Sequence, residues 1–162
     1  MSKILVLSDT HKNYDILKKV LKMEKNYNTI FHLGDDYEDI ESLKTEKEVS
    51  LFRVPGIFHP KYLSGVLPKT LIAEIDNISF TLVHSISDCL NPKTNFVLFG
   101  HTHNFTFYKK DGVYFLNPGH LKSETDRGHI ATYATVTINS SNIKLKIKSL
   151  FQDVIQDTSI SL

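Results

Sequence analysis

The 162-residue chain has a single cysteine, no tryptophan and almost no excess of charge of either sign. One cysteine, Cys89, excludes an intramolecular disulfide, and we expect its side chain to pack. A net charge of +1 gives no electrostatic reason for a nucleic-acid partner, which needs a clustered basic face. No apolar run approaches the ~20 residues of a membrane span, and no signal-peptide pattern is visible. We therefore expect a cytoplasmic protein without a membrane partner.

The composition, 41% hydrophobic and 23% charged, is typical of a folded globular protein. The length suits one domain with one core. The sequence shows no repeat, low-complexity tract or linker. We predict a single domain over residues 1–150. The last segment, 151–162, is polar and weakly patterned, and we expect an arm or a partly disordered tail.

The first third of the chain alternates strand and helix patterns. Residues 3–9 form a short apolar run, as in a strand buried on both faces. Leu17, Val20 and Leu21 then recur at helical spacing, and Asn13 can cap the start of that helix. The next expected elements are two strands, over 28–36 and 48–56, and an exposed helix over 37–47. This order predicts parallel βαβ units.

From residue 70 onward, strand patterns dominate. Asp76-Asn77 and Asp111-Gly112 each join two alternating apolar runs, and the second is a strong hairpin signal. Three further strand-like runs cover 95–100, 129–138 and 143–151. We therefore predict an α/β fold of two packed sheets with helices outside.

Acidic and histidine side chains gather where the predicted strands end. These residues are Asp9, His11, Asp35, His84, His101 and His103. Carboxylate oxygen and imidazole nitrogen together suit Mn²⁺, Fe²⁺, Ni²⁺ or Zn²⁺, and the missing thiolate argues against a structural zinc site. In extended chain, residues two apart point the same way, so each Asp-x-His or His-x-His pair can serve one centre. Singly, each motif also suits a cap or a core histidine; the full set favours a metal centre.

The motifs "SDTH", "LGDD", "LVHS", "FGHTH" and "NPGH", with the later "DRGHIATYATVTI", resemble those of the calcineurin-like metallophosphoesterases. The resemblance covers residues 3 to about 138 and is strongest to the small bacterial and archaeal phosphodiesterase subgroup. It implies a four-layer α/β/β/α sandwich of two mixed β-sheets flanked by helices. It also implies two divalent ions, Mn²⁺ first, with Ni²⁺, Fe²⁺ and Zn²⁺ open. The ligands it implies are Asp9, His11 and His103 for one ion, His84 and His101 for the other, and Asp35 between them.

The turn that begins at Gly56 departs from the family pattern, which places an asparagine ligand of the second ion after the glycine. Here Ile57 has no donor atom, which predicts a weakly held second ion. Phe58 stands where some members have a histidine thought to protonate the leaving group, so aryl or nucleotide esters are favoured over alkyl phosphates. Three interpretations of His59 stay open: a replacement metal ligand, a contact to substrate phosphate, or a residue packed between prolines.

We predict hydrolysis of a small phosphodiester by metal-bound hydroxide. In this scheme, Asp35, His84 and His101 are the catalytic residues. Asn104 and Arg127 would stabilise charge on the phosphoryl group, although Arg127 equally suits a surface residue. The other histidines, at 32, 120 and 129, are expected to support the ligands or the fold.

Other functions remain open. Ile57 and Phe58 favour a non-catalytic scaffold on the same fold, as in the eukaryotic retromer subunit that resembles this family. A nuclease acting on long DNA or RNA shares the chemistry, but the neutral charge balance disfavours it. A homo-oligomer is also open, because exposed strands such as 105–110 could pair between copies.

Overall fold

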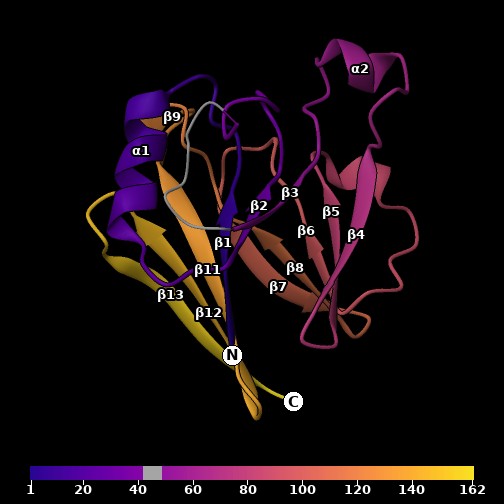
Figure 1. The fold of residues 1–162 in the computed structure, drawn as a ribbon, viewed down its shortest axis with the longest axis vertical. Helices are drawn as coiled ribbons and strands as arrows, with labels where there is room; N and C mark the ends of the chain where they lie inside the picture. Colours follow the sequence, from indigo (N-terminus) through magenta and orange to yellow (C-terminus); the bar gives the residue numbers. More distant parts are fainter. Residues whose placement is uncertain (42–48) are drawn as a thin grey trace.

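The computed structural model describes residues 1–41 and 49–162. Within these residues, two mixed β-sheets pack face to face, and α1 (Tyr14–Met23) lies on the outer side of the first sheet (Figure 1). The first sheet contains β1 (Ser2–Leu7), β2 (Thr29–His32), β3 (Ser50–Arg53), β11 (Thr132–Ile138), β12 (Asn142–Ser149) and β13 (Val154–Ser161), in the order β13-β12-β11-β1-β2-β3. β1, β2 and β3 are parallel, as the βαβ pattern predicts.

The second sheet contains β4 (Thr70–Ile75), β5 (Ile78–Val83), β6 (Phe96–Leu98), β7 (Thr106–Lys110) and β8 (Val113–Asn117), in the order β4-β5-β6-β8-β7. Its central strands β5, β6 and β8 are parallel, whereas β4 and β7 pair antiparallel at the edges. A short ribbon, β9 (Thr125–Asp126) with β10 (His129–Ile130), stands apart from both sheets. The expected α/β sandwich of two mixed sheets is confirmed.

Side-chain alternation along β1 explains why this strand reads as a continuous apolar run. Ile4 and Val6 face the core between the sheets, and Leu5 and Leu7 face the core beneath α1. All four are fully buried. The helix begins where expected, because the Asn13 side chain accepts a hydrogen bond from the Ile16 amide at 3.2 Å. Both faces of the first sheet are therefore covered in this region.

The turns of both predicted hairpins form as expected. Asp76 and Asn77 have φ of 50° and 62°, and Asp111 and Gly112 have 50° and 85°. These left-handed values are those of tight two-residue hairpin loops. Short helices not expected from the sequence are α2 (Pro60–Leu63) and the 3₁₀ turn η1 (Ile86–Asp88). No helix in the described part of the chain is both long and apolar enough to cross a membrane.

Two sequence-based expectations need correction. Residues 151–162 are not a free arm: Val154–Ser161 form β13, the edge strand paired with β12. The sequence signal was weak because the more buried positions of β13 include the polar residues Gln156 and Thr158. Over 37–41 the chain forms turns instead of the expected exposed helix, and the remainder of that prediction, 42–47, lies outside the described residues.

A buried carboxylate ties the end of α1 to the first sheet. Glu24 is 5% exposed and follows the helix as its C-terminal cap residue. Its oxygens lie 2.5 Å from Lys148 Nζ and 2.7 Å from Lys3 Nζ, and Tyr133 donates a third hydrogen bond at 3.0 Å. Burial by itself would raise the pKa of Glu24, but the hydrogen bonds and charges of the two lysines outweigh it and lower that pKa.

We expect Glu24→Gln to lower the free energy of unfolding at pH 7 by about 2 kcal/mol, because a buried charge-assisted hydrogen-bond set is weakened. The pKa of Glu24 in the folded protein lies below its ordinary value of 4.5. The contribution of ionised Glu24 to the free energy of unfolding is therefore complete above pH 4.5, and it is lost as the pH falls through the pKa of the folded state. Urea unfolding should therefore show a gap between variant and wild type that shrinks in acid. Exposed Glu74→Gln is the control, and equal stability of the Glu24 variant at pH 7 would contradict the prediction.

Candidate metal centre

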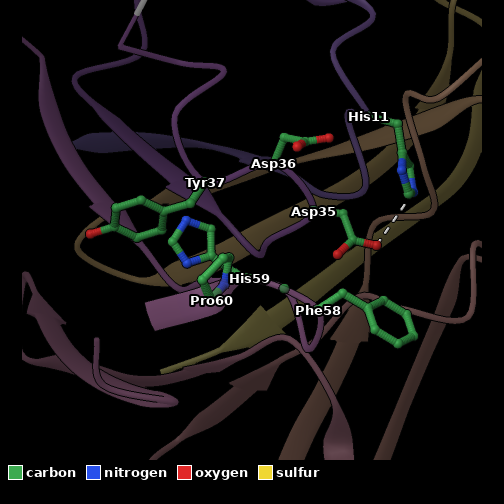
Figure 2. A pocket seen from close by; sticks show the side chains of 8 residues that line it. His11, Asp35, Asp36, Tyr37, Phe58, His59 and Pro60 are labelled. Carbon is green, nitrogen blue, oxygen red and sulfur yellow. Dashed lines mark ion pairs between the residues drawn. The ribbon is translucent and has the colours of Figure 1, made fainter. Parts of the chain in front are cut away.

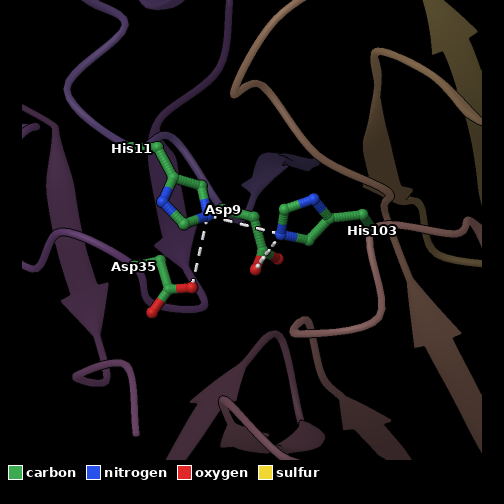
Figure 3. Close-up of side chains that lie close together, drawn as sticks. All are labelled: Asp9, His11, Asp35 and His103. Carbon is green, nitrogen blue, oxygen red and sulfur yellow. Dashed lines mark hydrogen bonds and ion pairs between the residues drawn. The ribbon is translucent and has the colours of Figure 1, made fainter. Parts of the chain in front are cut away.

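The predicted ligand residues converge from both sheets. Asp9 and His11 follow β1, Asp35 follows β2, His84 follows β5, and the two remaining histidines, His101 and His103, follow β6. Figure 3 shows Asp9, His11, Asp35 and His103 directed toward a common point. One donor atom from each of these four lies within 4.8 Å of the others. This geometry is compatible with a shared cation.

Donor atoms in this cluster face one another at close range. His11 Nε2 lies 3.3 Å from Asp35 Oδ2 and 3.3 Å from His103 Nε2. His103 Nε2 in turn lies 3.2 Å from Asp9 Oδ1. Burial lowers the pKa of His11, although the charge of Asp35 acts the opposite way. Burial also lowers the pKa of His103, but Asp9 and Asp126 outweigh it and leave this pKa raised.

His84 and His101 complete the arrangement from the second sheet. His84 Nε2 lies 3.5 Å from Asp35 Oδ1, and the two imidazole rings lie 5.2 Å apart between centroids. The two oxygens of Asp35 are thus turned to different histidines, one to His84 and the other to His11. Asp35 therefore occupies the position between two groups of donors.

Two buried polar atoms in this region test whether cations fit. Asp9 Oδ1 and His84 Nε2 find no hydrogen-bond partner among the described residues, and both side chains are fully buried. His84 Nδ1 donates to the Leu33 carbonyl at 2.7 Å, so its Nε2 carries the free lone pair. Buried polar atoms without partners are unfavourable, and a divalent cation would satisfy both. The donor set present here therefore fits the metal ions that the sequence resemblance implies.

Five of the six candidate ligand residues have a left-handed backbone conformation. Positive φ values occur at Asp9 (52°), His11 (46°), Asp35 (39°), His101 (69°) and His103 (62°). Residues other than glycine adopt such values only uncommonly, and they persist where surrounding structure holds them. Here the Asp9 amide donates to the Gly34 carbonyl at 2.9 Å, and the His101 amide donates to Asp9 Oδ2 at 3.0 Å. The loops are therefore held so that their side chains point inward.

Asp126, which the sequence analysis missed, lies directly behind His103. Its Oδ2 accepts a hydrogen bond from His103 Nδ1 at 2.6 Å, which leaves Nε2 of that ring free to face Asp9. The hydrogen bond from Lys122, with that of His103, lowers the pKa of Asp126 to about 2. Asp126 begins the quoted motif "DRGHIATYATVTI", but its contact with His103 depends on the β9–β10 ribbon and carries no local signal.

We expect Asp126→Asn to lower metal affinity and metal-dependent activity roughly tenfold, because outer partners of a ligating histidine fix its tautomer and orientation. The neutral asparagine amide accepts a weaker hydrogen bond from His103 Nδ1 than the charged carboxylate does. Metal titration by calorimetry and steady-state kinetics would measure both effects. Asp153→Asn, in the turn before β13, is the matched control. Unchanged metal affinity in Asp126→Asn would refute the positioning role.

The other predicted histidines lie behind the cluster or in its walls. His32 is buried, and its Nε2 lies 3.1 Å from Thr10 Oγ1, which in turn donates to the Asp35 carbonyl at 2.8 Å. Burial lowers the pKa of His32 to about 4, so the ring is neutral near pH 7. His120 stacks on His103 with centroids 5.1 Å apart and donates to the carbonyl of residue 129.

His59 is engaged elsewhere in this structure. Its Nδ1 accepts from the Lys61 amide at 3.2 Å, which caps α2, and its Nε2 lies 3.0 Å from Glu38 Oε1. Figure 2 shows the ring beside Tyr37 and Pro60, with Phe58 apart from them. Both ring nitrogens thus have protein partners, and His59 forms part of a cavity wall near Asp35.

Arg127 and Asn104 lie at the exposed rim. Arg127 Nη1 donates to the His101 carbonyl at 3.2 Å, and its side chain is 57% exposed. Asn104 is also exposed, next to His103 in the chain. The structure thus places both predicted phosphate contacts beside the cluster and not within it.

The chain is similar to known proteins over most of its length. The calcineurin-like phosphoesterase superfamily domain matches residues 2–141. The chain is 24% identical over 158 residues to a probable metallophosphoesterase of Mycoplasma pneumoniae, covering 88% of this chain and 94% of that one. Solved structures that share its fold include the following two. YfcE, a phosphoesterase from E. coli, has 16% identity and a TM-score of 0.71 over 96% of this chain and 98% of its own. Vacuolar Protein Sorting 29 from Cryptosporidium parvum has 18% identity and a TM-score of 0.73 over 99% and 98%.

The domain match covers most of the sequence and includes every residue of the cluster. The chain belongs to the calcineurin-like phosphoesterase superfamily.

Proposed function

We propose that the protein is a phosphodiesterase that hydrolyses small phosphodiesters at a site for two divalent cations. The observation that carries this proposal is the position of Asp35, whose Oδ2 lies 3.3 Å from His11 and whose Oδ1 lies 3.5 Å from His84. A carboxylate between two groups of imidazoles can bridge two cations and offset part of their repulsion. Asp9, His11 and His103 would hold one cation, and His84 and His101 the other.

The chain's own residues then have two roles. Asp126 and the Leu33 carbonyl fix the orientation of His103 and His84. The guanidinium of Arg127 and the amide of Asn104, at the rim, are available to the anionic substrate. Divalent cations would supply Lewis-acid stabilisation of phosphoryl charge and a lowered pKa for water. Mn²⁺ suits the mixed carboxylate and imidazole donors, as do Ni²⁺, Fe²⁺ and Zn²⁺.

The turn after β3 limits the chemistry. Ile57 has no donor atom and Phe58 has no proton to give, so this turn supplies neither a metal ligand nor a general acid. The second cation would be held more weakly than the first. Substrates whose leaving groups need no proton, such as aryl and nucleotide esters, would react fastest.

The test is hydrolysis of bis(p-nitrophenyl) phosphate by protein loaded with Mn²⁺, Ni²⁺, Fe²⁺ or Zn²⁺, with metal content measured on the same samples. We expect activity that requires added metal and rises as the second equivalent binds. No turnover with any of these ions between neutral and alkaline pH would refute the proposal.

A non-catalytic scaffold is the second candidate. It is favoured by Ile57 at the expected ligand position and by the likeness to Vacuolar Protein Sorting 29. A scaffold would purify with one weak ion or none, and it would keep its fold and partner binding when Asp35 is substituted. Two ions bound per chain under manganese would exclude this candidate.

A further inference from the structure

A cavity opens beside Asp35, and His84, His101 and His103 are not among the residues that line it. Its volume is ≈ 230 Å³, and its walls include Asp35 and His11 together with Tyr37, Phe58, His59 and Pro60. Figure 2 shows these side chains around the opening. The cavity is thus lined by two candidate metal ligands, Asp35 and His11, and by the aromatic rings of nearby side chains.

Phe58 is unusual among these rings because it is 79% exposed. It belongs to none of the hydrophobic clusters formed by the described residues. The aromatic face of an exposed phenylalanine is available for stacking, and every nucleobase or aryl group presents a matching face. Packing of the fold therefore does not account for Phe58.

Tyr37 is held as a rigid surface on the opposite wall. The Arg53 guanidinium lies 3.9 Å from its ring centroid and donates to the Tyr37 carbonyl at 2.8 Å. The His59 ring lies 5.8 Å away and is itself fixed by Lys61 and Glu38. Binding surfaces whose rotamers are already locked lose little entropy on association. This wall is preorganised.

We propose that this cavity is a subsite for an aromatic group, a nucleobase or an aryl ring, of the phosphodiester substrate, with Phe58 as its stacking residue. The proposal rests on the phosphodiesterase function above. The volume is smaller than the roughly 300–1,000 Å³ of complete ligand pockets, which suits one ring system. The acidic side chains of Asp36 and Glu38 on this side disfavour a second phosphate. The substrate class is therefore a nucleoside or aryl phosphodiester with a single phosphate.

Fluorescence gives a test that does not depend on turnover. The chain has no tryptophan, so Phe58→Trp introduces a single reporter. We expect adenosine 5′-monophosphate to change its emission saturably in manganese-loaded protein, and methyl phosphate not to do so. Leu63→Trp is the matched control, since Leu63 is 71% exposed on α2 and does not line the cavity. Equal responses of both reporters, or none from Phe58→Trp, would overturn the subsite.

Kinetics separate the subsite from the reaction itself. For wild type, the inhibition constant for hydrolysis of bis(p-nitrophenyl) phosphate should be higher for methyl phosphate, which has no ring, than for adenosine 5′-monophosphate, so the ratio of the two constants should be well above 1. Phe58→Ala should lower this ratio roughly tenfold, and Phe58→Tyr should restore it. If the wild type hydrolyses the substrate and Phe58→Ala leaves the ratio unchanged, the subsite is refuted and the proposed phosphodiesterase function is retained. No hydrolysis with a positive Phe58→Trp titration would overturn the phosphodiesterase and support aromatic binding. Loss of an oligomer in Phe58→Ala, with nucleotide binding unchanged, would assign the ring to a subunit contact and overturn the subsite.

Discussion

Asp35→Asn is expected to lower kcat/KM for metal-dependent phosphodiester hydrolysis by at least ~10³-fold. One oxygen of Asp35 faces His11 and the other faces His84, so the carboxylate serves both groups of donors. The amide keeps one oxygen but replaces the second by an NH₂ group, which cannot ligate a cation, and it removes the negative charge that offsets two positive ions. Metal content per chain should fall by up to one ion, as measured by plasma emission after desalting.

The control for this experiment is Asp76→Asn. Asp76 has a comparable left-handed backbone, φ 50° against 39° for Asp35, but lies in the exposed turn between β4 and β5. It tests the same change of side chain in the same backbone conformation, far from the cluster, and should leave activity and metal content as they are. If Asp35→Asn kept both wild-type activity and two ions, the reaction would have to take place elsewhere on the molecule.

Much of the architecture could be predicted because it depends on local patterns. The double burial of β1 is visible as an uninterrupted apolar run, and the turn at Asp111-Gly112 is visible in two residues. That the candidate ligand residues lie close together could be predicted for a related reason. Strand ends are rigid, so the side chain of a polar residue directly after a buried strand has a restricted position. Such side chains on neighbouring strands therefore lie close together at one edge of the sheet.

The remainder depends on contacts between segments that carry no local signal. Asp126 reaches His103 only because a ribbon of two short strands folds across the site. The position of His59 follows from α2, a single helical turn whose cap is the histidine itself. β13 is an edge strand, and backbone pairing with β12 defines it more than side-chain burial does. Hydrophobic periodicity in a sequence indicates which side chains are buried, so it misses helices and strands that bury few apolar side chains.

The loop that carries Phe58 also contacts Asp35 through Gly56, so the proposed subsite and the candidate metal centre share one segment. Gly56 is buried beside Asp35, and a Cβ atom at this position would overlap Asp35 Oδ1 and approach the Asp35 amide nitrogen. Its φ lies outside the left-handed region, so alanine is excluded by space and not by backbone conformation. The Asp35 carboxylate can therefore keep its position only if residue 56 is glycine.

Gly56→Ala is accordingly expected to lower kcat/KM at least ~10²-fold, because the added methyl group must displace the Asp35 carboxylate, and shifts of about 1 Å at a reacting centre have effects of that size. A double-mutant cycle isolates the cause. In an Asp35→Asn background the same Gly56→Ala change should have little further effect on kcat/KM, since the carboxylate through which it acts is already gone. Thermal unfolding of the four proteins, followed by circular dichroism, accounts for any general loss of stability. If the two substitutions instead multiply in their effects on kcat/KM, Gly56 acts on the fold as a whole and not through the position of Asp35.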